Sequence, residues 1–126
     1  MKPICAAIVF AVFAQSQAAP PIAGRIRIEK TAAGAVRFAP AEVVAWSGDL
    51  IHWYNETGEA HEPGVLNSDG TFVAFLEAPV AARSGSSVFS PLARVDDSGK
   101  QVPFTIRYVC GRHRGEQGVI QVIPTP

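Results

Sequence analysis

Cysteine is scarce in this chain of 126 residues, which contains only Cys5 and Cys110. Cys5 lies near the start of an apolar N-terminal run, and we expect it to be lost when that run is removed. The mature chain then holds a single cysteine, which excludes an internal disulfide. A lone cysteine in an exported protein is either a buried thiol that packs as a small apolar group or a thiolate bound to a metal. The neighbours of Cys110 decide between these two explanations.

Long apolar runs are also missing. Residues 4–14 are almost continuously apolar, but this run is well short of the ~20 residues that a membrane-spanning helix needs. Lys2 precedes the run and small residues end it at Ala18, which is the pattern of a Sec-type signal peptide. We therefore expect residues 1–18 to be a signal peptide, and residues 19–126 to be a periplasmic or secreted protein without a membrane anchor.

Neither sign of charge is in excess, because eleven Lys and Arg residues balance eleven Asp and Glu residues. This balance argues against nucleic acid or a membrane surface as a partner.

The mature chain is long enough for one hydrophobic core and too short for two. The sequence also lacks a Gly-rich phosphate loop, a Ser-His-Asp pattern and an H-E-x-x-H zinc motif. We therefore expect a single domain that is monomeric and is not an enzyme.

Helical periodicity is almost absent. Apolar residues alternate over short runs, and Gly, Pro, Asn and Asp interrupt them at intervals of about ten residues. This pattern predicts an all-β protein, a Greek-key β-sandwich of about eight strands. The expected strands are residues 25–29, 36–38, 42–46, 50–54, 71–76, 87–90, 103–110 and 119–123.

The expected strand that ends at Cys110 shows the clearest alternation. Phe104, Ile106, Tyr108 and Cys110 share one face, so the thiol points toward the core at the point where the strand ends. Functional side chains are often placed at such junctions. His113 follows three residues later, and a thiolate and an imidazole at this spacing can converge on one metal ion from a tight loop. A copper site of the two-His, one-Cys type then needs a second imidazole.

His61 is the candidate for this second imidazole. It follows the expected strand 50–54 through the turn-rich residues 55–60, which bring it to the end of the sandwich. His52 lies in the middle of that strand, on the face opposite Trp53, where an exposed side chain is expected. His52 is therefore left out of the predicted site, and Trp53 is assigned to the core.

Two blocks of the sequence resemble the cupredoxins, in particular plastocyanin, pseudoazurin and amicyanin. The first block contains Phe38-Ala39-Pro40, Gly48-Asp49-Leu50-Ile51-His52-Trp53-Tyr54-Asn55 and His61. The second is Tyr108-x-Cys110-x-x-His113-x-x-Glu116-x-Gly118-x-Ile120, which is similar to the family ending Y-x-C-x-x-H-x-x-M-x-G-x-I. The resemblance implies a cupredoxin fold that holds one mononuclear copper ion through His61, Cys110 and His113. It also implies one-electron exchange with a redox partner protein.

The sequence departs from the family at Glu116, which stands where the weak axial methionine is expected. The only methionine is Met1, so the mature chain has no thioether ligand. A carboxylate at the metal is a harder, anionic donor, which favours Cu(II) over Cu(I) and lowers the reduction potential. Glu116 is therefore included as a fourth metal ligand. Two alternatives stay open. In the first, Glu116 is exposed and paired with Arg112 or Arg114, and the carbonyl of Ala60 approaches the metal instead. In the second, the Cys-His-His-Glu set holds tetrahedral zinc.

A second departure is Glu62, where many members of the family have a small polar residue that links the two ligand loops. This substitution leaves the stiffness of the site open. Arg112 and Arg114 flank His113, the ligand that the resemblance places nearest the surface. They either steer an acidic redox partner or, as we favour, are neutralised by the acidic residues of the His61 loop, which are Glu56, Glu59 and Glu62.

The predicted function is that of an exported one-electron copper carrier. Two alternatives stay open at this point. One is a copper carrier or sensor that is not tuned for fast electron transfer, and the other is a cupredoxin-like structural module that binds zinc or no metal.

Overall fold

The computed structural model describes residues 20–125, and the regular elements of this part of the chain are all β-strands. The predicted signal peptide and Cys5 lie outside the described residues. Within residues 20–125, no helix is long and apolar enough to cross a membrane. The ten strands, in chain order, are β1 (Arg25–Lys30), β2 (Val36–Ala39), β3 (Glu42–Trp46), β4 (His52–Asn55), β5 (Pro63–Leu66), β6 (Phe72–Ala74), β7 (Arg94–Val95), β8 (Gln101–Val102), β9 (Phe104–Cys110) and β10 (Gln117–Ile123).

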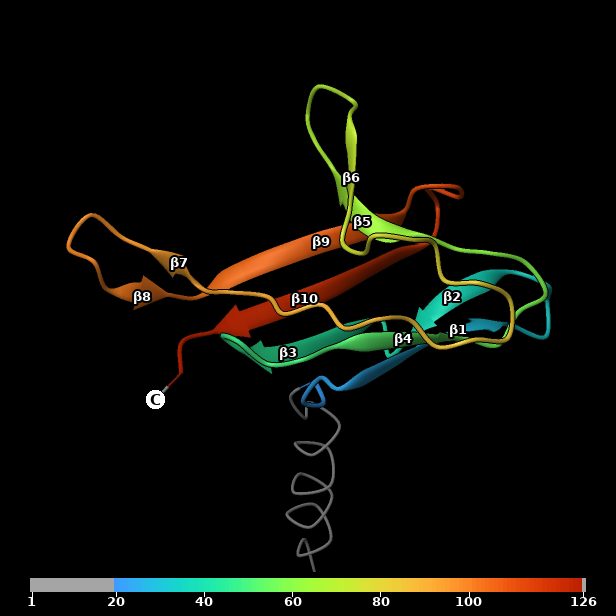
Figure 1. The fold of residues 1–126 in the computed structure, drawn as a ribbon, viewed down its shortest axis with the longest axis horizontal. Coiled ribbons are helices and arrows are strands. Elements are labelled where there is room, and N and C mark those ends of the chain that lie inside the picture. The colour runs from blue at the N-terminus through green and yellow to red at the C-terminus, as the bar shows by residue number, and fades with distance from the viewer. Residues whose placement is uncertain (1–19, 126) are drawn as a thin grey trace, which may run out of the picture.

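The strands form two main sheets and a separate hairpin (Figure 1). The smaller sheet has the strand order β2-β1-β4 and the larger has the order β3-β10-β9-β5-β6, while β7 pairs only with β8. β1 and β4 run parallel, and so do β3 and β10, whereas the other neighbours are antiparallel. The predicted all-β sandwich is therefore confirmed.

The core lies between the two main sheets and is filled by alternate residues of their strands. In β9, Ile106, Tyr108 and Cys110 are buried while Thr105 and Arg107 are exposed, so the predicted alternation is confirmed. Burying a large apolar side chain contributes about 1.5–3 kcal/mol, and these contributions fix the register, because a shift by one residue would turn the apolar face outward. The fully buried side chains that β1, β2 and β4 supply to the core are Ile26, Ile28, Phe38 and Trp53.

Three parts of the strand prediction were wrong. β5 was not expected, because its Pro63 and Gly64 are poor strand formers; β5 exists because it pairs with both β6 and β9. Residues 87–90 form no strand, and Phe89 makes only an isolated bridge to Ile51. The strands β7 and β8 were also not expected; they form a short hairpin that is closed by a turn in which the Gly99 N–H donates to the Asp96 carbonyl.

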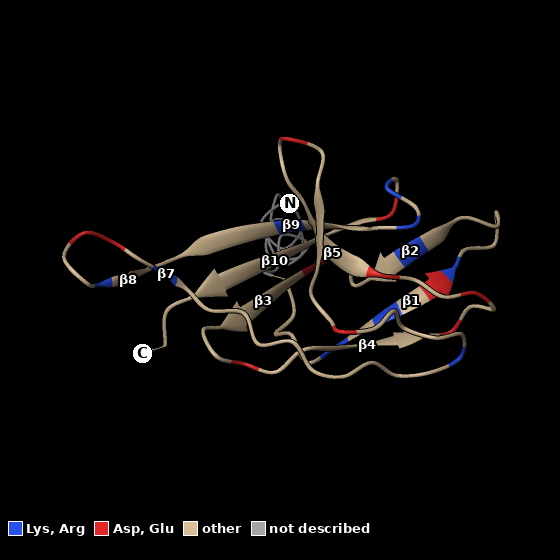
Figure 2. Cartoon of the chain, turned by 45° about the horizontal axis from the view of Figure 1, so that its top comes forward, with Lys and Arg blue, Asp and Glu red and all other residues tan. Residues whose placement is uncertain are grey.

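The two ends of the sandwich differ in character. The β9–β10 loop lies at the end opposite the projecting β7–β8 hairpin (Figure 1). The connection from β4 to β5, which contains His61, lies at the same end as the β9–β10 loop, because Pro63 pairs with Cys110. Basic and acidic residues both occur at this end (Figure 2). The fold therefore brings the two predicted ligand segments together.

Candidate metal centre

Residues 111–116 form a tight loop that contains His113 and Glu116 and directly follows Cys110. The backbone N–H of His113 donates to the carbonyl of Cys110 (3.2 Å), and that of Glu116 donates to the carbonyl of His113 (2.9 Å). The Cys110 N–H donates in turn to the Glu116 carbonyl (3.0 Å), which closes the loop. Two successive turns thus convert the three-residue spacing of the sequence into proximity in space.

His61 approaches this loop from the other ligand segment, and its side chain is completely buried. Its backbone pairs with Val80 in both directions, with the His61 N–H donating at 3.1 Å and the Val80 N–H donating at 2.8 Å. A buried imidazole held by two backbone hydrogen bonds has little freedom to move. The sandwich therefore fixes His61 before any ligand arrives.

Glu62 links the two ligand segments through its backbone. Its N–H donates to Sγ of Cys110 (3.3 Å), and its carbonyl accepts from the N–H of Gly111 (2.7 Å). The link that the family resemblance assigns to a polar side chain is thus made by main-chain atoms here. This answers the question of stiffness, which the identity of the Glu62 side chain could not settle.

The four predicted ligands lie in one cluster. His61, Cys110, His113 and Glu116 each offer one donor atom, and these four atoms lie within 4.8 Å of one another. Sγ of Cys110 is 3.8 Å from Nδ1 of His61 and 3.8 Å from Nδ1 of His113. The Glu116 carboxylate is 3.1 Å from His61 Nδ1 through Oε1 and 3.5 Å from His113 Nδ1 through Oε2. Donors bound at 2.0–2.3 Å to one ion are ~3–4 Å apart, so the spacing suits a single ion.

The surroundings of Glu116 Oε1 indicate whether the cluster fits a metal ion. This atom is buried and has no hydrogen-bond partner among residues 20–125, and the Glu116 side chain as a whole is only 10% exposed. A buried carboxylate oxygen without a partner is costly, and a cation between the four donors would satisfy it. Two imidazoles, a thiolate and a carboxylate are ligands that Cu(II) and Zn(II) accept. The residues present therefore fit such an ion.

The alternative in which Glu116 is exposed and paired with an arginine was wrong, because the carboxylate turns inward. Within residues 20–125, neither Arg112 nor Arg114 makes an ion pair. Two acidic residues of the His61 loop are near other groups, since Glu59 lies 3.6 Å from His113 Nε2 and Glu56 lies 3.8 Å from Arg27, so any neutralisation of the two arginines does not use direct ion pairs within residues 20–125.

Burial raises the pKa of the Cys110 thiol in the absence of a metal. Backbone N–H groups of Glu62, Arg112 and His113 lower the pKa to a smaller extent, and the nearby Glu116 carboxylate raises it further. The anionic sulfur therefore needs a positive charge close by. A bound metal cation supplies such a charge and holds the sulfur as thiolate.

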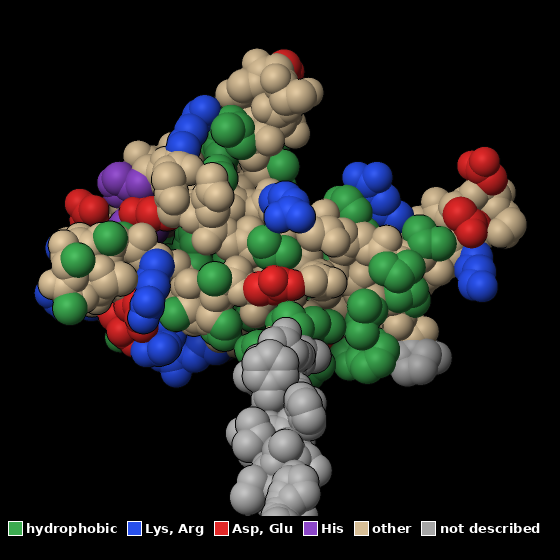
Figure 3. Space-filling view, turned by 180° about the vertical axis from the view of Figure 1, so that it is seen from behind, with side chains coloured by type: hydrophobic (Ala, Val, Ile, Leu, Met, Phe, Trp, Pro, Cys, Tyr) green, Lys and Arg blue, Asp and Glu red, His purple; other side chains and the backbone are tan. Residues whose placement is uncertain are grey.

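The two imidazoles differ in their access to solvent. The His113 side chain is 40% exposed, whereas that of His61 is 0% exposed. Histidine reaches the molecular surface at this end, beside acidic side chains (Figure 3). Of the two imidazoles, His113 is therefore the one nearer the surface, as expected.

His52 lies outside the cluster, as expected, and is half-buried on β4. Sequence reasoning missed Thr57, whose Oγ1 lies 3.0 Å from Nε2 of His61. The only signal available was a hydroxyl residue four positions before a predicted ligand, and this signal is too common to identify a contact.

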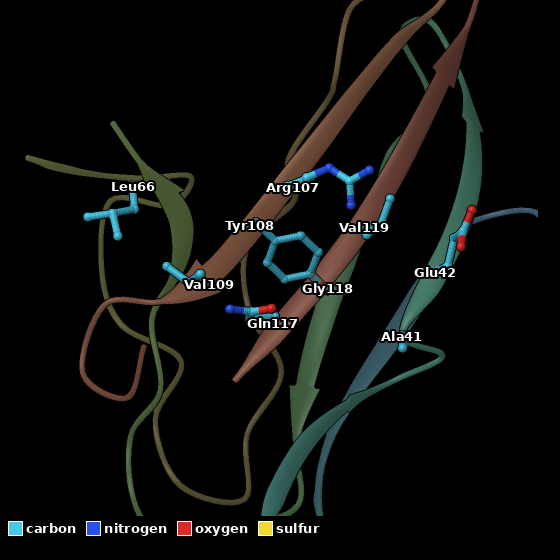
Figure 4. A pocket seen from close by; sticks show the side chains of 9 residues that line it. All are labelled: Ala41, Glu42, Leu66, Arg107, Tyr108, Val109, Gln117, Gly118 and Val119. Atoms are coloured by element: carbon cyan, nitrogen blue, oxygen red, sulfur yellow. The ribbon is translucent and has the colours of Figure 1, made fainter. Parts of the chain in front are cut away.

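A hollow of about 490 Å³ lies over the larger sheet (Figure 4). Arg107, Gln117 and Val119 are among its lining residues, which include none of the four donor residues. The hollow is therefore separate from the candidate metal centre.

Comparisons with known structures identify the fold of this chain. No protein-family model and no curated protein sequence matches the chain. Amicyanin from Paracoccus versutus superposes with a TM-score of 0.54 and 19% sequence identity over 85% of each chain. A purple cupredoxin from Nitrosopumilus maritimus superposes with a TM-score of 0.58 and 15% identity, over 79% of this chain and 98% of that one. This chain therefore has the cupredoxin fold.

Proposed function

We propose that the chain is a one-electron carrier that holds a single copper ion through His61, Cys110 and His113, with Glu116 as a fourth ligand. The observation that carries this proposal is the convergence of the four donor atoms within 4.8 Å, together with the buried carboxylate oxygen that lacks a partner in the described residues. In this assignment the protein is not an enzyme. Its working part is residues 19–126, exported to the periplasm or beyond by residues 1–18.

Copper, when bound, would supply one-electron redox chemistry between Cu(I) and Cu(II). The residues determine how favourable each state is. The Cys110 thiolate and the Glu116 carboxylate place two negative charges at the site, which balance a divalent ion better than a monovalent one. The backbone hydrogen bonds of Glu62 and Val80 hold the ligands in nearly one arrangement. The ligands therefore have to move little when the charge of the ion changes. We therefore propose a carrier of low reduction potential.

Electron exchange is assigned to the exposed edge of His113. Arg112 and Arg114 flank this ring and make no ion pair within residues 20–125, so an acidic surface on the partner would complement them. Opposite charges speed the encounter of two proteins at low ionic strength. The proposed partner is a redox protein with acidic residues around its own electron-exchange site.

A second candidate is supported by the position of Glu116. Four protein ligands of the Cys-His-His-Glu type can close a tetrahedral zinc site with no position left open, which is typical of structural zinc. In that case the chain would be a structural or interaction module. A copper carrier or sensor that delivers its ion, rather than electrons, would use the same four residues.

The test is to add Cu(II) to the purified mature protein and to record its visible spectrum and its voltammogram. We expect one equivalent to bind, with an intense thiolate-to-copper absorption and a reversible one-electron wave. The variant Cys110→Ser should lose the absorption, whereas His52→Gln, a matched change of a histidine outside the cluster, should keep it. A wild-type protein that binds zinc but gives no thiolate-copper band would contradict the carrier. Rapid loss of copper to a chelator without a reversible wave would favour delivery of the ion.

A further inference from the structure

Asn55, the last residue of β4, is a buried side chain whose orientation is set by its neighbours. Its Nδ2 lies within hydrogen-bonding distance of three backbone carbonyls, those of Glu59 (2.7 Å), Val80 (3.1 Å) and Ala81 (3.2 Å). Turning the amide over would place its oxygen against those carbonyl oxygens. Oδ1 of Asn55 therefore faces Thr57, as an acceptor only.

Thr57 donates the one proton of its hydroxyl within this network. Its Oγ1 is 2.7 Å from Asn55 Oδ1 and 3.1 Å from the Glu59 carbonyl, and both of these oxygens can only accept. The Thr57 N–H also donates to Asn55 Oδ1, at 2.9 Å. The hydroxyl proton is thus used, and toward any further neighbour Oγ1 can only accept.

His61 is that further neighbour, with Nε2 at 3.0 Å from Thr57 Oγ1. Since Thr57 can only accept here, His61 Nε2 carries a hydrogen. A ring with one proton then has a bare lone pair on Nδ1, the nitrogen that faces Glu116 Oε1 (3.1 Å) and Cys110 Sγ (3.8 Å). This is the nitrogen that a metal ion in the cluster would need.

We propose that Thr57 is a positioning residue that, together with Asn55, selects the metal-binding tautomer of His61 before an ion is present. Asn55 orients Thr57, Thr57 accepts from Nε2, and Nδ1 is left free and aimed at the cluster. The same contacts tie the His61 loop to the segment at Val80. The proposal rests on the proposed function only in its statement that an ion binds at Nδ1.

The first measurement needs no metal. Nitrogen-15 NMR of the metal-free protein with labelled histidine reports which ring nitrogen carries the proton, and spectra at several pH values distinguish the neutral ring from the doubly protonated one. We expect His61 to be entirely in the Nε2–H form in the wild type and in Thr57→Ser, which keeps the hydroxyl. In Thr57→Val, which keeps the shape and loses the acceptor, we expect a mixture of both forms, while the signals of His52 and His113 stay as in the wild type.

The second measurement is the affinity for Cu(II) and for Zn(II), determined by competition with a chelator. Removing a partner that orients a ligating histidine typically weakens metal binding 10–100-fold, and we expect such a loss for Thr57→Val but not for Thr57→Ser. The matched control is Thr71→Val. Thr71 donates to Asp69 and accepts from Asn67 in the exposed β5–β6 hairpin, so its loss should not change the affinity.

The outcomes separate this proposal from the proposed function. A wild-type His61 with the proton on Nδ1 would overturn the proposal even if no variant folds. A Thr57→Val protein with an unchanged tautomer and unchanged affinity would overturn it too. If the wild type binds neither copper nor zinc, the proposed function fails, and a mixture of tautomers confined to Thr57→Val would still support the selection of the His61 tautomer.

Discussion

His61 Nδ1 and Glu116 Oε1 lie 3.1 Å apart in a buried site, and both atoms carry lone pairs when the neutral imidazole holds its proton on Nε2. Two such atoms repel each other unless a positive charge lies between them. The thiol sulfur of Cys110 approaches the same point from β9. The folded protein thus holds three electron-rich groups around one small volume. Their mutual repulsion is unfavourable, and this repulsion is offset when a cation binds.

Replacing Glu116 tests whether its carboxylate contributes to the redox properties of the copper form. In Glu116→Gln a neutral donor replaces an anionic one, and in Glu116→Met a soft donor replaces a hard one. Both changes should favour Cu(I), and a tenfold change in the relative affinity for the two oxidation states shifts a one-electron potential by about 60 mV. We expect the potential to rise by at least this amount, measured by voltammetry.

The control for this experiment is Glu59→Gln. Glu59 is a carboxylate at the same end of the fold, but its side chain is 62% exposed and lies 3.6 Å from Nε2 of His113, the nitrogen that faces away from the cluster. Its removal changes the local charge without removing a donor from the cluster, so the rise should be much smaller. Equal shifts in Glu116→Gln and Glu59→Gln would mean that Glu116 acts only as a distant charge.

The four clustered side chains were predictable from the sequence as a candidate site, whereas the contacts that hold them in place were not. The sequence has three of these residues at three-residue intervals, beginning at the end of an alternating strand: Cys110, His113 and Glu116. This spacing can be recognised without a structure. The hydrogen bond from the Glu62 N–H to Cys110 Sγ uses a main-chain donor, which every residue except proline has, so the identity of the side chain does not reveal it. The same holds for the core: the apolar alternation of β9 predicted its buried face, but the parallel pairing of β3 with β10 depends on segments far apart in the chain.

β5 shows the physical limit of the strand prediction. It begins at Pro63 and continues with Gly64, two residues that weaken a strand in isolation. It forms because β6 and β9 flank it on both sides and satisfy its backbone. A Cβ on Gly64 would lie 2.4 Å from the carbonyl oxygen of Val73, so the close approach of β6 requires glycine there. Tertiary context has thus overridden local propensity.

Gly118 is expected to be essential for packing, since a Cβ at this position would lie 2.4 Å from the Tyr108 ring. The ring is buried and has no room to retreat. Forcing a methyl group into a filled core costs about 1–3 kcal/mol, so Gly118→Ala should lower the free energy of unfolding by this amount in urea titrations of the metal-free protein. Gly115→Ala is the matched control: no atom lies within 4 Å of its added Cβ, and its stability should change by less than about 0.5 kcal/mol.

Tyr108 should make the protein sensitive to alkali. Burial raises the pKa of its hydroxyl far above the usual value near 10, while the hydrogen bond from Trp53 lowers it only slightly. Above pH ~10 the unfolded chain releases this proton while the folded chain keeps it. The unfolded state then binds fewer protons, and stability falls by up to about 1.4 kcal/mol per pH unit.

The measurement is the free energy of unfolding of the metal-free protein at several pH values above and below 10. Tyr108→Phe should show a shallower decline above pH ~10 than the wild type, even if its stability at neutral pH is lower. The half-buried Tyr54 provides the matched variant, Tyr54→Phe, which should keep the wild-type decline. A decline that is as steep in Tyr108→Phe as in the wild type would contradict the assignment.

Arg112 should steer the approach of electron acceptors to His113. Reversing its charge in Arg112→Glu should slow oxidation of the reduced copper protein by an anionic oxidant such as hexacyanoferrate and speed oxidation by a cationic cobalt complex. The reversal changes the charge by two units, each worth about 1 kcal/mol at close range in water, so we expect changes of roughly 30-fold at low ionic strength, which vanish at high salt. Lys100→Glu places the same reversal on the β7–β8 hairpin at the opposite end, as Figure 2 shows, and should leave both rates nearly unchanged. Equal effects of the two variants would mean that the net charge of the protein governs the encounter, and not the surface around His113.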